Sequence, residues 1–87
     1  MKIKGNFVLR EIVGEYVLVP VNETALNFNA VISLNEAGAM IWQDLQMQKT
    51  AAQILSHLVS EFEVTKEEAM TDLGDFLDQL KENNLIE

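Results

Sequence analysis

The fold of this chain is decided within residues 26–42, which read LNFNAVISLNEAGAMIW. In the first part of this stretch apolar side chains occupy every second position, at Leu26, Phe28, Ala30, Ile32 and Leu34. That period is typical of a strand with one buried face. From Asn35, which is a suitable helix N-cap, the apolar residues recur at helical spacing. The stretch therefore predicts a strand that leads directly into a helix.

Two further strands are predicted upstream of this stretch. Residues 7–13 and 16–21 are short runs rich in β-branched residues, and Gly14 and Glu15 separate them as a turn. Pro20 cannot donate a hydrogen bond to a strand ladder, so it marks an outer position, a bulge or a strand end. Because the connections are short, we expect a three-stranded antiparallel meander.

Three helices are predicted after the strands. The first follows Asn35, and capping boxes of Thr50 with Gln53 and of Thr65 with Glu68 begin the other two. Strands followed by helices indicate an α+β fold, and 87 residues suffice for one domain over residues 1–87. We expect one core that contains Phe28, Ile32, Ile41, Trp42, Leu58, Leu73 and Phe76, with the tail Leu85-Ile86 against it.

Two glycines lie inside predicted helices, where glycine costs about 1 kcal/mol relative to alanine. Gly38 belongs to the apolar stripe of the first helix, so we expect another element to pack closely on it. In the third helix Gly74 lies beside Met70 and Leu77, on one flank of the stripe centred on Leu73. Gly74 is either a tolerated surface glycine or a point where another backbone approaches.

Composition and charge disfavour several classes of protein. The chain has no Cys, which excludes disulfides and thiolate chemistry and fits a reducing compartment. No stretch is long and apolar enough to span a membrane. Residues 1–34 hold three bases and three acids, and residues 35–87 hold three bases and eleven acids, so the whole net charge of −8 lies in the second half. We therefore expect a cytoplasmic protein that binds neither nucleic acid nor an anionic membrane.

No residue pattern in the chain is typical of catalysis. His57 is the single histidine, and we interpret it as a partly solvated surface residue without partners. The third helix carries six carboxylates, namely Glu67, Glu68, Asp72, Asp75, Asp78 and Glu82. Most of them lie opposite Leu73, and we interpret them as a solvated face. The sequence thus predicts no enzyme, no cofactor and no metal site.

The pattern resembles the PqqD family, named for the small protein of pyrroloquinoline quinone (PQQ) biosynthesis. The motif Leu-Asn-Glu-x-Gly-x-x-Ile-Trp at residues 34–42 is the most specific part of the resemblance. The run at residues 16–20 and the spaced apolar residues from Asp72 to Ile86 also fit. The resemblance covers nearly the whole chain, from about residue 7 onward.

The resemblance implies a RiPP recognition element, which is a non-catalytic domain with a winged-helix-like fold. Such domains bind the leader of a ribosomally synthesised precursor peptide and present it to a modifying enzyme, commonly a radical SAM protein. The leader adds as a strand along the third β-strand, in the cleft against the third helix, which is β-augmentation. On this chain the implied peptide-binding residues are Asn27, Phe28, Asn29, Ala30, Val31, Ile32, Ser33, Met70, Leu73, Gly74 and Leu77.

The residues themselves add detail to this hypothesis. Met70 and Leu77 are apolar and adaptable, so we expect them to be pocket walls, with Gly74 leaving room between them for a leader side chain. Substitution of Gly74 by Leu is then expected to weaken binding by more than about tenfold, or about 1.4 kcal/mol.

Two other functions remain open at this point. A DNA-binding winged helix shares the fold class, but residues 61–87 hold nine acids and two lysines, which opposes contact with phosphates. A scaffold or dimerisation module without a peptide ligand is the other alternative, so a homodimer is left open.

Overall fold

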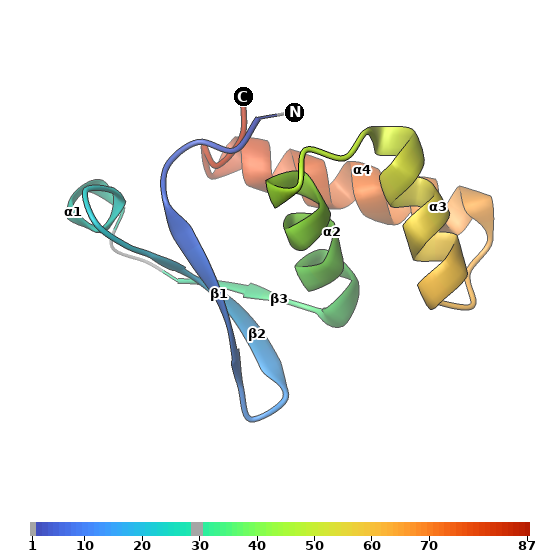
Figure 1. The fold of residues 1–87 in the computed structure, drawn as a ribbon, viewed down its shortest axis with the longest axis horizontal. Coiled ribbons are helices and arrows are strands. Elements are labelled where there is room, and N and C mark those ends of the chain that lie inside the picture. Colours follow the sequence, from blue (N-terminus) through green and yellow to red (C-terminus); the bar gives the residue numbers. More distant parts are fainter. Residues whose placement is uncertain (1, 29–30) are drawn as a thin grey trace.

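The computed structural model describes residues 2–28 and 31–87. Three strands and four helices follow one another along this part of the chain (Figure 1). They are β1 (Phe7–Ile12), β2 (Glu15–Pro20), α1 (Thr24–Asn27), β3 (Ile32–Leu34), α2 (Glu36–Gln46), α3 (Ala51–Glu61) and α4 (Lys66–Glu82). The predicted α+β fold, an antiparallel sheet followed by helices, is confirmed.

The strands form one antiparallel sheet in the order β1-β2-β3. The turn between β1 and β2 is Val13-Gly14, one residue earlier than predicted, and both residues have positive φ angles, of 51° and 79°. A two-residue turn of this kind matches the twist of a hairpin. Leu18 of β2 pairs with Leu9 on one side and Ile32 on the other, and Leu18 is fully buried.

The third strand is shorter than the sequence predicts. Among the described residues of the predicted third strand, Ile32–Leu34 pair with β2, whereas residues 24–27 form the short helix α1. Turn hydrogen bonds start this helix, because the N–H groups of Ala25 and Leu26 donate to the carbonyls of Asn22 and Glu23. Leu26 is consequently 83% exposed rather than buried. The prediction of a strand from residue 26 is therefore wrong for residues 26–28 and for Val31, which lie outside β3, and Asn29 and Ala30 lie outside the described residues.

The predicted core is confirmed with one adjustment. Six of its members are buried in one cluster, namely Ile32, Ile41, Trp42, Leu58, Leu73 and Phe76. Phe28 is half-buried against that cluster, with its ring edge-on to the ring of Phe7 at a centroid distance of 5.4 Å.

The two ends of the chain meet, as Figure 1 shows. Ile3 and Ile86 form an isolated antiparallel bridge, and the Lys4 N–H donates to the Leu85 carbonyl at 2.7 Å. Leu85 and Ile86 are buried, so the prediction of a C-terminal tail against the core is confirmed.

Gly38 is the point where α4 approaches α2. A Cβ atom on Gly38 would lie 3.1 Å from Cε1 of Phe76 and 3.2 Å from Oδ1 of Asn35. Gly38 also donates its N–H to Asn35 Oδ1 at 2.7 Å, which confirms Asn35 as the helix cap. The expectation of close packing on Gly38 is thus confirmed, and the packing group is the ring of Phe76.

We predict opposite effects for substitutions at the two helical glycines. Gly38→Val should lower the free energy of unfolding by about 1–3 kcal/mol, because its side chain overlaps the Phe76 ring. Gly74→Ala should raise it by about 0.5–1 kcal/mol, because no atom lies within 4 Å of the added methyl and alanine favours the helix. Denaturant unfolding followed by circular dichroism measures both values. A Gly38→Val protein as stable as wild type would contradict this packing.

Candidate functional site

The free edge of β3 is the starting point of the candidate site. Among the described strands β3 pairs only with β2, so its other edge has no neighbouring strand. An unpaired edge presents N–H and C=O groups that can pair with another chain. The outer edge of β1 is also unpaired among the described strands, but no residue of β1 is among those that line the cavity formed with α4.

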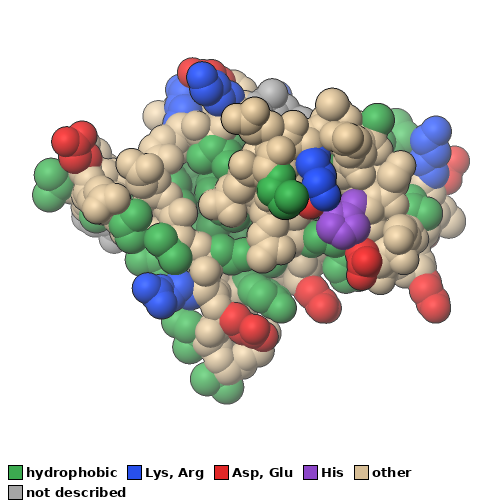
Figure 2. All heavy atoms as spheres, viewed as in Figure 1, with side chains coloured by type: hydrophobic (Ala, Val, Ile, Leu, Met, Phe, Trp, Pro, Cys, Tyr) green, Lys and Arg blue, Asp and Glu red, His purple; other side chains and the backbone are tan. Residues whose placement is uncertain are grey.

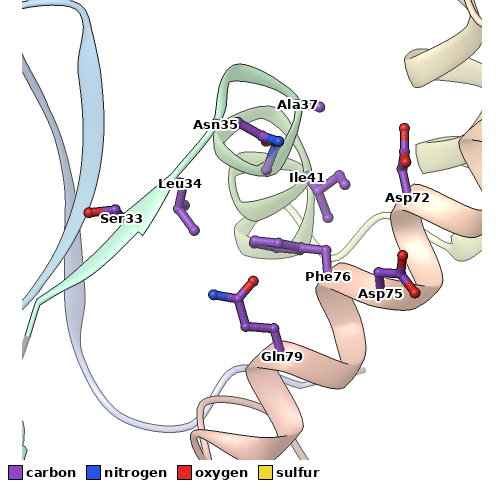
Figure 3. A pocket seen from close by; sticks show the side chains of 10 residues that line it. Ser33, Leu34, Asn35, Ala37, Ile41, Asp72, Asp75, Phe76 and Gln79 are labelled. Atoms are coloured by element: carbon purple, nitrogen blue, oxygen red, sulfur yellow. The ribbon is translucent and has the colours of Figure 1, made fainter.

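A cavity of about 350 Å³ lies between the end of β3, the start of α2 and the middle of α4 (Figure 3). Its apolar surface comes from Leu34, Ala37, Ile41 and Phe76. Figure 3 shows Phe76 and Gln79 extending from α4 toward α2 and β3. Ser33 lines the cavity from the strand side. The cavity therefore joins an apolar floor to a strand edge that can form main-chain hydrogen bonds.

The helix α4 contributes polar side chains to the same cavity. Asp72, Asp75 and Gln79 line it and are exposed, and no Lys or Arg does so. Among the described residues, neither Asp72 nor Asp75 takes part in an ion pair. The α4 side of this cavity is therefore acidic.

The structure places the strand residues of the predicted site at different depths. Ile32 is buried and faces the core, whereas Val31 is 58% exposed and Ser33 is exposed. Asn27 lies in α1, and Phe28 packs against Phe7. Of the predicted strand residues that the structure describes, Ser33 is the one that lines the cavity.

The helix residues of the predicted site do not line this cavity. Leu73 is buried in the core, Leu77 is half-buried, and Met70 is 54% exposed. Gly74 faces open space, with no atom within 4 Å of its Cβ position. The cavity-lining residues of α4 are on the other flank of Leu73, and two of them, Asp72 and Asp75, belong to the face that the sequence predicts to be solvated.

Asp44 and His57 form a polar pair that the sequence does not predict. Nδ1–H of His57 donates to Oδ2 of Asp44 at 2.7 Å, and Nζ of Lys49 lies 3.4 Å from Oδ1 of the same carboxylate. Asp44 is only 2% exposed. The interpretation of His57 as a residue without partners is therefore wrong, since it joins α3 to a buried carboxylate of α2. Figure 2 shows the histidine beside a basic side chain on the surface.

A second cavity, of about 370 Å³, lies beside this pair on another face of α2. Tyr16, Met40, Gln43, His57 and Glu61 are among its lining residues. It does not reach β3, so no unpaired strand edge opens into it. We therefore take the cavity beside β3 as the candidate site.

Neither a metal site nor a membrane-spanning helix is found among the described residues. Within residues 2–28 and 31–87, no group of three or more His, Cys, Asp or Glu side chains is arranged to hold a metal ion. In the same residues no helix has the length and apolar content needed to cross a membrane.

Comparison with known proteins supplies the family. The model of the family described as Coenzyme PQQ synthesis protein D (PqqD) matches residues 15–86. The chain belongs to the PqqD family. A solved structure described as TbiB1 in complex with the TbiA(beta) leader peptide matches with a TM-score of 0.78 and 29% sequence identity. That match covers 100% of this chain and 95% of TbiB1. No curated protein matches the chain. The predicted membership of the PqqD family is confirmed.

The Asp44–His57 pair leads to a prediction on stability. His57→Ala should lower the free energy of unfolding by about 1–3 kcal/mol, because the buried carboxylate then loses its 2.7 Å donor. Ser56→Ala, an exposed position on the same helix, is the control and should change it by less than about 0.5 kcal/mol. Equal effects of the two substitutions in denaturant unfolding would show that the pair does not stabilise the fold.

Proposed function

We propose that this protein is a non-catalytic RiPP recognition element. It binds the leader of a ribosomally synthesised precursor peptide and presents that peptide to a modifying enzyme, such as a radical SAM protein. The leader adds to the sheet as an antiparallel strand along the free edge of β3. The observation that carries this proposal is the unpaired β3 edge beside a cavity with an apolar floor.

The physical argument rests on two kinds of contact. Main-chain hydrogen bonds to a strand edge supply affinity without regard to sequence, and side-chain pockets supply selection. The cavity provides such a pocket through Leu34, Ile41 and Phe76. The PqqD membership and the likeness to TbiB1, whose structure contains a leader peptide, support the same function.

The charge of the chain argues against DNA binding, the other function considered for a winged-helix-like fold. A winged helix that binds DNA needs a basic surface, but Asp72 and Asp75 line the cavity and the net charge is −8. Peptide binding does not require a basic surface.

The proposed binding surface combines β3 with the cavity flank of α4. It consists of Val31, Ile32, Ser33 and Leu34 on the strand side and Asp72, Asp75, Phe76 and Gln79 on the helix side. The sequence pattern instead predicts binding on the opposite flank of α4, which carries Met70, Gly74 and Leu77. One pair of variants separates the two flanks.

We predict that Gln79→Trp weakens peptide binding at least about tenfold, because the larger side chain fills the cavity beside β3. Gly74→Leu should leave the affinity within about twofold of wild type, because Gly74 faces open space away from that cavity. The probe is a peptide selected against the wild-type protein from a displayed library of random peptides. Isothermal titration measures its affinity for each variant, and circular dichroism checks that both variants fold.

The reverse pattern, with Gly74→Leu weakening binding and Gln79→Trp leaving it unchanged, would place the peptide on the Met70 flank. A library that yields no binding peptide would contradict the peptide-binding function itself.

A further inference from the structure

The cavity beside β3 has a charge asymmetry that bears on which peptides can enter it. The α4 flank that faces it carries Asp72 and Asp75 with no basic residue between them, and neither aspartate has an ion-pair partner among the described residues. The bases of α4, Lys66 and Lys81, do not line this cavity. A carboxylate on an entering peptide would meet two like charges, whereas a cation would meet two opposite ones.

The apolar part of the cavity lies next to this acidic part. Phe76 and Asp72 are four residues apart on α4, which separates them by about 6 Å along the helix axis. Alternate side chains of a strand point to the same face and are about 6.6 Å apart. In Figures 1 and 3 β3 and α4 run in nearly the same direction, with α2 between them. Two side chains at positions i and i+2 of an added strand therefore match the spacing of Phe76 and Asp72.

We infer that this protein selects peptides in which a Lys or Arg and an apolar residue are two positions apart. The apolar side chain enters over Phe76 and Leu34, and the cation lies at Asp72, where the neighbouring Asp75 adds to the negative charge. This inference rests on the proposed function, because it assigns the specificity of the same β3 site.

Peptide display tests this specificity directly. Wild-type protein is used to select from a displayed library of random peptides, and the selected sequences are compared with the input. The same selection is run on the double variant Asp72→Asn, Asp75→Asn. The matched control is Asp78→Asn, Glu82→Gln, which removes the same charge from α4 at two exposed positions that do not line the cavity.

We expect wild type and the control to enrich Lys or Arg two positions from an apolar residue, and the Asp72/Asp75 double variant to lose that enrichment. A synthetic peptide with this spacing should bind the double variant about tenfold more weakly than wild type, and the control within about twofold. Moving the cation by one position should remove the advantage, since neighbouring side chains of a strand point to opposite faces.

Three outcomes overturn the inference. If wild type selects peptides without basic enrichment, the specificity is wrong but the proposed function stands. If the control loses enrichment as fully as the double variant, net charge rather than the cavity causes the preference. If no peptide is selected at all, the proposed function fails together with the inference.

Discussion

The contact between the Phe76 ring and the bare backbone of Gly38 sets how closely α4 approaches the start of α2. Because Gly38 has no side chain, the ring reaches within 3.1 Å of the position that a Cβ atom would occupy. This places α4 against the start of α2, which follows β3 after the single residue Asn35. The cavity, its apolar floor and its acidic flank all result from this placement. A side chain at position 38 would push α4 away from the strand edge.

The second constraint is an unpaired strand edge in a small acidic protein. Open edges favour aggregation, and proteins limit that risk by keeping edge strands short. Here β3 has only three residues, and α1 replaces the part that the alternating pattern assigns to a strand. A short edge gives few main-chain hydrogen bonds. Selection must then come largely from the cavity, which is why its apolar and acidic groups matter for function.

Local signals in the sequence predict much of the fold. The caps at Asn35, Thr50 and Thr65 are formed as expected, because a cap depends only on residues within one turn. The alternation from Leu26 to Leu34 misleads at its start, since the turn bonds of residues 22–26 outweigh strand propensity there. The PqqD resemblance assigns the peptide to the third strand and the last long helix, and these two elements border the cavity.

The flank of α4 that faces β3 cannot be deduced from the helix alone. A wheel centred on Leu73 gives one apolar flank with Met70 and Leu77, and one acidic flank with Asp72. Apolar character favours the first, but the position of Phe76 against Gly38 turns the second toward the strand. The burial of Asp44 is easier to predict from the sequence, because this carboxylate lies within the apolar stripe of Ile41 and Leu45. Its partner His57 is thirteen residues away, beyond the range of helical periodicity.

The most direct measurement is an isotope-filtered nuclear Overhauser experiment on the labelled protein with an unlabelled selected peptide. Strand addition at β3 predicts contacts from peptide amide and α protons to backbone protons of residues 32–34, and from one peptide side chain to the Phe76 ring. Contacts confined to the outer edge of β1, or to Met70 and Leu77, would contradict the placement of the peptide at β3.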